Sequence, residues 1–164
     1  MIAVIQRVKK ASVSIDDTVT GACDTGFLVL LGVAQGDGER EAELLADKII
    51  KMRVFEDSDE KMNLSLTDIG GELLVISNFT LLASCRRGNR PDFMGAERPE
   101  KASPLFDYFC DYIGRTIPHV ARGTFGADMQ VSILNDGPVT ILLDSDVLKL
   151  PKSQAQRGKT EEPV

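Results

Sequence analysis

Residue types that often carry catalysis or bind metals are scarce in this 164-residue sequence. It has one histidine, His119, and three widely spaced cysteines, Cys23, Cys85 and Cys110. No Cys-x-x-Cys pair is present, so neither a disulfide framework nor a zinc ribbon is indicated, and a histidine-rich metal site cannot be built. A Ser-His-Asp or Cys-His site would have to use His119, which follows Pro118 and is more typical of a helix end or the surface. We expect reduced thiols, no metal and no cofactor.

A long apolar run is also missing. The longest nearly unbroken one covers residues 27–34, far short of the roughly 20 residues that a membrane-spanning helix needs. Near the N-terminus, Arg7, Lys9 and Lys10 lie among alternating residues, and the apolar core of a signal peptide is absent. We expect a cytoplasmic protein without a membrane partner.

Positively charged residues are fewer than negatively charged ones. The sequence has 19 Lys and Arg and 25 Asp and Glu, which gives a net charge of −6. This argues against a protein that binds a long stretch of nucleic-acid backbone, since such affinity comes from neutralising phosphates. Recognition of one end of an RNA is still compatible with this charge. Arg86, Arg87 and Arg90 form a local basic patch, which is either a tRNA contact or a solvated charge run.

The length predicts one domain with a substantial core, and the 43% hydrophobic and 27% charged residues are typical of a globular protein. The domain is expected over residues 1–150. Residues 151–164 show no apolar periodicity and are expected to form a mobile C-terminal tail.

Most of the chain has the alternation or the β-branched runs of strands. Residues 27–33 and 73–76 lack a solvent-facing alternation, which predicts strands that are buried on both faces. Arg7 shares a strand face with Ile5, so we expect it to point inward and to bond carbonyl groups or a carboxylate. Further strands are predicted over residues 2–8, 11–15, 18–20, 120–125, 129–134 and 139–144.

Two segments have helical spacing. Residues 39–54 place apolar side chains on one stripe, and a second helix is predicted from near Pro99, or from Ser103-Pro104, to Ile117. Residues 84–97, rich in Arg, Gly and Pro, are predicted to form a long loop. Many antiparallel strands and two covering helices predict an α+β fold.

Small polar residues interrupt the strand that begins at Leu73. Ser77, Asn78 and Thr80 occupy positions where a core would place methyl groups, and buried polar groups need partners. A second segment, residues 135–140, reads Asn-Asp-Gly-Pro-Val-Thr and follows another strand-like run. Taken singly, the first segment can be a strand end that bonds nearby backbone, and the second can be a turn.

Together the two segments resemble the paired motifs Ser-Gln-Phe-Thr-Leu and Asn-x-Gly-Pro-Val-Thr of the D-aminoacyl-tRNA deacylases, also called D-tyrosyl-tRNA deacylases. The resemblance extends from Met1 to Asp146. It includes residues 3–8, 61–65, 88–91 and 123–129. The sequence departs from the family pattern at Asn78, where the family usually has Gln.

The resemblance implies hydrolysis of the ester that joins a D-amino acid to the terminal ribose of a tRNA, and of glycyl-tRNA formed by mischarging. It also implies a barrel-like sheet and a homodimer with its active site at the subunit interface. The catalytic candidates are Ser77, Asn78, Phe79 and Thr80. Because no His, Cys pair or metal cluster lies in either motif, we expect catalysis by positioning and backbone dipoles, with the N–H groups of Phe79 and Thr80 stabilising the oxyanion.

Thr80 is either a nucleophile, which would need a nearby base, or a hydrogen-bonding scaffold. In the scaffold alternative, the 2′-hydroxyl of the substrate orients the attacking water, as has been proposed for the family.

Gly137, Pro138, Met129 and Arg7 are the candidates for substrate binding and chiral selection. The resemblance implies a cis Gly137-Pro138 bond that enters the partner subunit's site. Its carbonyl groups would form a steric barrier that excludes an L side chain but cannot exclude glycine. Two other functions are compatible with the sequence. One is a non-catalytic module that binds the tRNA 3′ end, with Phe79 or Phe93 stacked on a base, and the other is a structural oligomer in which both motifs are turns.

Overall fold

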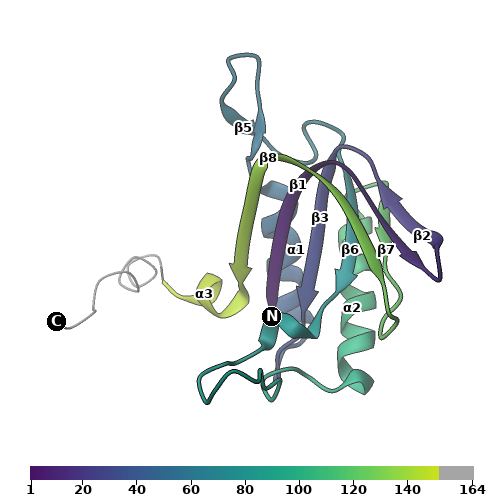
Figure 1. The fold of residues 1–164 in the computed structure, drawn as a ribbon. Coiled ribbons are helices and arrows are strands. Elements are labelled where there is room, and N and C mark those ends of the chain that lie inside the picture. Colours follow the sequence, from purple (N-terminus) through teal and green to yellow (C-terminus); the bar gives the residue numbers. More distant parts are fainter. Residues whose placement is uncertain (152–164) are drawn as a thin grey trace.

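The computed structural model describes residues 1–151, and a six-stranded sheet forms its centre (Figure 1). The sheet runs in the order β2 (Thr18–Cys23), β1 (Ile2–Ile15), β3 (Gly26–Gly32), β6 (Glu72–Ser77) and β7 (Val120–Arg122), and β8 (Gln130–Asp144) pairs with β1. A separate hairpin contains β4 (Phe55–Glu56) and β5 (Met62–Leu64). The helices are α1 (Glu39–Lys51), the 3-10 helix η1 (Phe79–Leu82), α2 (Pro99–Gly114) and α3 (Ser145–Lys149). Apart from Pro151, the predicted tail lies outside the described residues.

The sheet is mixed, so the prediction of a mostly antiparallel sheet was wrong. Strand β1 runs antiparallel to β2, β3 and β8, whereas β3, β6 and β7 run parallel to one another. The chain passes through α1 between β3 and β6, and through α2 between β6 and β7. A connection through a helix returns the chain to the end where the previous strand began, so the next strand runs in the same direction.

Two helices, α1 and α2, cover one face of the sheet (Figure 1). These are the two covering helices that were predicted, whereas α3, which follows β8 directly, was not predicted. The Asp144 side chain caps α3 by accepting a hydrogen bond from the Asp146 N–H at 2.9 Å. Five residues are too few to show a helical stripe, so the capping residue is the only local signal for this helix.

The prediction that β3 and β6 are buried on both faces is confirmed. Phe27, Val29 and Leu73 pack with the residues of α1 and α2, while Leu28 and Leu74 belong to a second apolar cluster. All five side chains are fully buried. Both faces of these strands are therefore apolar, which explains the missing alternation in their sequences.

The sheet bends until β2 approaches β7, which gives it a nearly closed, barrel-like shape (Figure 1). His119, next to β7, places its Nε2 atom 2.9 Å from the Ala22 carbonyl oxygen of β2. The His119 side chain is 54% exposed. It is therefore a surface residue that links two strands, and it lies outside both sequence motifs.

Strand β8 is continuous where two strands and a turn were predicted. Its register with β1 pairs Gln6 with Thr140 and Val8 with Asn135, so Arg7 alone faces residues 136–139. The three extra residues form a bulge that contains the cis Gly137-Pro138 bond. The Gly-Pro pair thus distorts β8 without ending it, since Pro is tolerated in strands at bulges. The predicted strands 2–8 and 11–15 are likewise one strand, β1.

Element ends differ from the predictions by a few residues. Helix α1 was predicted to end at Val54 and ends at Lys51. Val54 lies outside the helix, and its carbonyl accepts a hydrogen bond from Arg7. Helix α2 begins at Pro99, the earlier of the two predicted starts, and contains Pro104. None of the helices within residues 1–151 has the length and apolar character that a membrane crossing requires.

Candidate active site

The polar motif of residues 77–80 lies where the chain leaves the sheet. Ser77 is the last residue of β6, and the Asn78 N–H donates to the Leu31 carbonyl of β3 at 2.8 Å. The chain then turns into η1 instead of continuing as a strand. Gly32 allows this turn to pack closely, since a Cβ atom there would lie 2.5 Å from the Leu82 side chain and 3.0 Å from the Asn78 carbonyl oxygen.

Asn78 organises η1 with a single side-chain oxygen. Its Oδ1 atom accepts a hydrogen bond from the Thr80 N–H at 3.1 Å and another from the Thr80 hydroxyl. The Thr80 N–H is therefore already bonded, in contrast to its predicted role as an oxyanion donor. The Phe79 N–H, at the first position of η1, has no hydrogen-bond acceptor within residues 1–151.

A cavity of about 460 Å³ adjoins this strand end. Four of the predicted site residues, Ser77, Asn78, Phe79 and Met129, line it, whereas Thr80 does not. The remaining lining residues are mostly apolar: Leu31, Val33, Ala96, Glu97, Pro99, Ala102, Phe106, Phe125, Gly126 and Ala127. The cavity thus joins small polar groups on one side to an apolar chamber on the other.

Sequence reasoning missed several cavity residues. Phe106 lies in α2 and Phe125 in the loop that follows β7, and their ring centroids lie 6.3 Å apart. Glu97 accepts a hydrogen bond from the Arg98 N–H at 2.8 Å, and this bond lowers the pKa of its carboxyl group. Glu97 is therefore ionised at neutral pH and is a weak general base. No local motif marks these residues, because only the fold brings them to one cavity.

Neither buried cysteine can supply a nucleophile. Burial raises the pKa of the Cys23 thiol to about 11 and that of the Cys110 thiol to about 12. Both thiols are therefore protonated at neutral pH, and the thiolate is the reactive form. Cys85 is exposed and does not line the cavity.

Gly137 and Pro138 lie at the opposite end of the sheet from Ser77. Arg7, beside the bulge, pairs with Phe27 of β3, and Phe27 pairs in turn with Leu73 of β6. Ser77 of β6 pairs with Leu31, four residues farther along β3. From strand rise and strand spacing, this register places Arg7 on the order of 16 Å from Ser77, and the bulge lies one strand farther away, on β8. Figure 1 shows the bend of β8 beside the β4–β5 hairpin, while β6 ends near the N-terminus. One chain does not bring its two motifs together.

The bulge is held on both of its sides. The Gln6 Oε1 atom accepts hydrogen bonds from the Asn135 amide, at 3.2 Å, and from the Thr140 hydroxyl. Arg7 is buried, as its strand position predicted, and its Nε atom lies 3.3 Å from the Asp136 carbonyl oxygen. Gly137 and Pro138 themselves are exposed.

The predicted basic patch lies on a loop that follows η1. Two hydrogen bonds between the backbones of Ser84 and Asp92, of 2.8 and 2.9 Å, close the loop, and Arg86, Arg87 and Arg90 between them are exposed. The next residue after Asp92 is Phe93, whose ring packs edge-on against the Phe79 ring at 5.0 Å. The basic loop is thereby fixed next to the candidate site.

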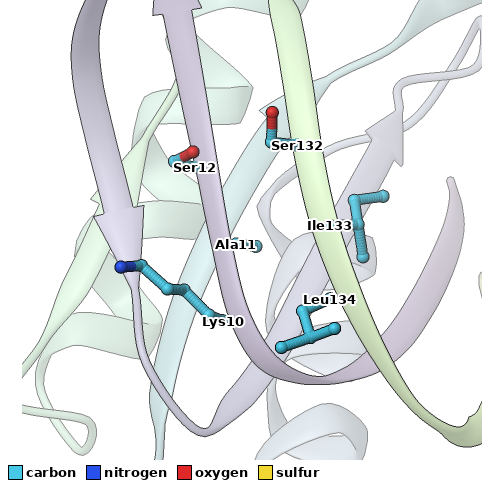
Figure 2. A pocket seen from close by; sticks show the side chains of 6 residues that line it. All are labelled: Lys10, Ala11, Ser12, Ser132, Ile133 and Leu134. Carbon is cyan, nitrogen blue, oxygen red and sulfur yellow. The ribbon is translucent and has the colours of Figure 1, made fainter.

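A second hollow, of about 290 Å³, lies between β1 and β8 (Figure 2). Ser12 and Ser132 face each other there as paired residues of the two strands. The other lining residues are Lys10, Ala11, Ile133 and Leu134. It contains none of the predicted site residues and only one titratable side chain, so we assign the chemistry to the larger cavity.

The site combines three features: the Phe79 N–H, which has no acceptor in the described chain, the small polar side chains of Ser77 and Asn78, and an apolar cavity. Sites of this class bind a small organic group and polarise its carbonyl. The D-Tyr-tRNA(Tyr) deacylase family matches residues 4–144. The chain belongs to this family.

Relatives match almost the full chain. A D-aminoacyl-tRNA deacylase of Roseiflexus sp. (strain RS-1) is 52% identical over 154 residues, which cover 94% of this chain and 99% of that protein. The protein of the same name from Anaeromyxobacter dehalogenans (strain 2CP-C) is 53% identical over 145 residues, which cover 88% and 97%.

Two solved structures share the fold. One is titled c-Myc DNA Unwinding Element Binding Protein and has a TM-score of 0.83 and 41% sequence identity, covering 88% of this chain and 98% of that chain. The other, a probable eukaryotic D-amino acid tRNA deacylase, has a TM-score of 0.73 at 15% identity, covering 87% and 97%. At that identity the second match supports the fold alone.

Proposed function

We propose that this chain hydrolyses the ester bond of D-aminoacyl-tRNA and releases free tRNA and the D-amino acid. The observation that carries the proposal is the Phe79 N–H at the end of β6, beside a cavity large enough for a nucleoside. Relatives about 52% identical to this chain are named for this activity. The reaction removes tRNA charged with the wrong enantiomer, so the cytoplasm, where translation occurs, is the expected location.

The terminal adenosine of the tRNA is assigned to the cavity. A volume of about 460 Å³ lies within the range of small-molecule pockets. Phe106, Phe125 and Met129 supply apolar surface for a base. The reacting ester is attached to the ribose of that adenosine, so it reaches the polar rim formed by Ser77 and Phe79.

The Phe79 N–H stabilises the negative charge that develops on the ester carbonyl oxygen. A fixed backbone donor needs no reorganisation during the reaction, and one such donor typically contributes about 10²–10³ in kcat. A water molecule attacks the carbonyl carbon, and the ribose 2′-hydroxyl of the substrate orients it. The activated ester requires no metal in this scheme.

Thr80 acts as a scaffold in this mechanism. Its hydroxyl donates to the Asn78 Oδ1 atom, and an amide oxygen is not a base that could activate a nucleophile. Its backbone N–H bonds the same oxygen. Both groups of Thr80 therefore fix η1, which in turn directs the Phe79 N–H.

Chiral selection requires a second copy of the chain. Gly137 and Pro138 are exposed and lie far from their own Ser77, so we infer a homodimer in which each copy inserts this pair into the other copy's site. The main chain there forms a steric barrier against an L side chain. Such a barrier separates enantiomers without a pocket for the D side chain, so D-amino acids of different sizes and glycine are all substrates.

Arg86, Arg87 and Arg90 are assigned to contacts with tRNA phosphates near the 3′ end. Their loop is exposed and is fixed against the site by Phe93 and Phe79. A short basic loop on a chain of net charge −6 suits binding at one end of an RNA. A strong dependence of binding on salt concentration is expected.

Single-turnover cleavage of D-alanyl-, glycyl- and L-alanyl-tRNA with matched tRNA bodies tests the proposal. With a chelator present throughout, we expect cleavage of the first two and sparing of the third. Activity that disappears on chelation and returns with zinc would contradict the metal-free mechanism. If glycyl-tRNA resists cleavage as fully as L-alanyl-tRNA, selection must recognise the D side chain, and the barrier is rejected. Binding of all three without cleavage would support the non-catalytic module.

A further inference from the structure

Gln6 bonds the two ends of the segment proposed to select chirality, and one buried side chain, Arg7, lies against its middle. In the bulge, Gly137 has a φ of +117°, which glycine tolerates and side chains disfavour. A Cβ atom at Gly137 would lie 3.1 Å from the Arg7 Nη2 atom. The Arg7 guanidinium therefore lies against Gly137, and whatever fixes Arg7 also fixes the direction of the Gly137-Pro138 backbone.

Arg7 is 6% exposed and has few partners. Its Nη1 atom donates to the Val54 carbonyl at 2.6 Å. Its Nε atom lies 3.3 Å from the Asp136 carbonyl oxygen and 3.2 Å from the Asp136 carboxylate. Asp136 thus contacts the guanidinium through both its backbone and its side chain, immediately before Gly137.

The other charged side chains near Arg7 and Asp136 are more exposed than these two. Lys9 is 60% exposed and lies 3.5 Å from the Asp136 carboxylate, while Glu56 is 53% exposed and lies 3.8 Å from Arg7. Asp136 is only 26% exposed. Exposed ion pairs contribute little, whereas a buried cation that loses its partner is costly. Asp136 is therefore the main counter-charge of Arg7.

We propose that Asp136 is a specificity-determining positioning residue: its carboxylate holds Arg7, and Arg7 holds the Gly137-Pro138 barrier in the direction that excludes L substrates. Asp136 occupies the variable position of the Asn-x-Gly-Pro motif. The inference rests on the proposed function, in which this segment selects chirality. It adds that the carboxylate acts on selectivity more than on turnover.

The test is Asp136→Asn, which keeps the size of the side chain and removes its charge. The measured quantity is the ratio of single-turnover rates on D-alanyl- and L-alanyl-tRNA. We expect this ratio to fall by about tenfold or more through faster L cleavage, since displacements near 1 Å are enough to change rates strongly. The D rate should stay within about threefold of the unmodified protein.

Lys9→Gln is the matched control, because it removes the exposed partner of the same carboxylate and leaves Arg7 bound. Its D-to-L ratio should change by less than about twofold. Both rates scale with the amount of folded enzyme, so partial unfolding does not alter their ratio. If Asp136→Asn does not fold, Asp136→Ser provides the same measurement, because it also removes the charge.

The outcomes separate the two proposals. If the unmodified protein does not distinguish D from L, the proposed function fails, whatever Asp136 does. If the unmodified protein discriminates and both Asp136 variants retain its ratio, the proposed function stands and the role of Asp136 is overturned. An equal fall of both rates, with the ratio unchanged, also overturns it, because that result indicates a purely structural residue.

Discussion

Asn78 shows how one residue can be suited to its position although it departs from the family motif. Its Oδ1 atom accepts two hydrogen bonds from Thr80 and so starts η1. Gln carries the same amide on a side chain that is one methylene longer. The sequence alone located this residue at the site but gave no reason for the departure, since the cap depends on a helix too short to predict.

We expect Asn78→Gln to keep or raise the rate of D-alanyl-tRNA cleavage, because the acceptor oxygen is retained. Asn78→Leu is the control that removes the acceptor and leaves two donors of Thr80 unbonded, and it should lower the rate by about tenfold or more. Single-turnover kinetics measure both. A folded Asn78→Gln protein without activity would show that the role of this residue is misassigned.

Phe79 allows a direct test of the backbone donor. Phe79→Pro removes the N–H, and Pro is favoured at the first position of a helix, where no helical hydrogen bond is lost. Asn78 already has the extended backbone, φ −146° and ψ 93°, that a residue before Pro adopts. We expect kcat to fall by about 10²–10³.

Phe79→Ala is the matched control, since it keeps the N–H and removes the ring. Its kcat should exceed that of Phe79→Pro by at least about tenfold. Circular dichroism establishes that both variants are folded. Equal rates for the two variants would mean that the ring contributes to catalysis and the N–H does not.

At the scale of elements, burial patterns were predictable and irregular geometry was not. Strands β3 and β6 were evident from their uninterrupted apolar sequences, and the α1 stripe of Ala42, Leu45 and Ile49 is buried as expected. The continuity of β8 was missed because Gly137-Pro138 resembles a turn. Only the pairing with β1 decides between a turn and a bulge, and pairing is a long-range property.

Gly32, the last residue of β3, sets how closely η1 packs against the sheet beside the candidate site. Gly32→Ala places a Cβ atom 2.5 Å from Leu82 and 3.0 Å from the Asn78 carbonyl oxygen, so η1 must move. We expect D-alanyl-tRNA cleavage to fall by about tenfold or more. The free energy of unfolding, measured with denaturant, should fall by about 1–3 kcal/mol.

Gly114→Ala is the control for this change. It lies in α2, and no atom within 4 Å would meet its Cβ atom, so the stability and the cleavage rate should be unchanged or slightly higher. Normal kinetics in Gly32→Ala would show that the position of η1 does not matter for the reaction.

At the scale of the molecule, the pair of motifs could be recognised from the residues alone, but their separation in space could not. The distance between Ser77 and Gly137 depends on how β1, β3, β6 and β8 pair, and no local pattern encodes that register. The cavity likewise depends on residues 96–129 meeting Leu31 and Ser77 at the ends of β3 and β6, which is a long-range property. A chain with its two motifs at opposite ends needs a second chain to unite them, which is the basis of the proposed dimer.

Mixed dimers test whether the selector acts on the partner's site. Gly137→Ala should loosen the barrier, because its Cβ atom meets Arg7 and Val139, and this variant should cleave L-alanyl-tRNA. Phe79→Pro chains are expected to be nearly inactive but carry an intact Gly137-Pro138 pair. In a mixed dimer, the only site with the Phe79 N–H therefore receives the intact barrier.

Adding inactive Phe79→Pro chains should thus lower L-alanyl-tRNA cleavage per Gly137→Ala chain. With equal amounts and random pairing, half of the Gly137→Ala chains lie in mixed dimers, so the L rate should fall by about half. The two chains are folded together to exchange subunits. The control partner carries both Phe79→Pro and Gly137→Ala and should leave the L rate unchanged. If the Phe79→Pro partner has no more effect than this control, the selector acts within its own chain, and the exchanged site is disproved.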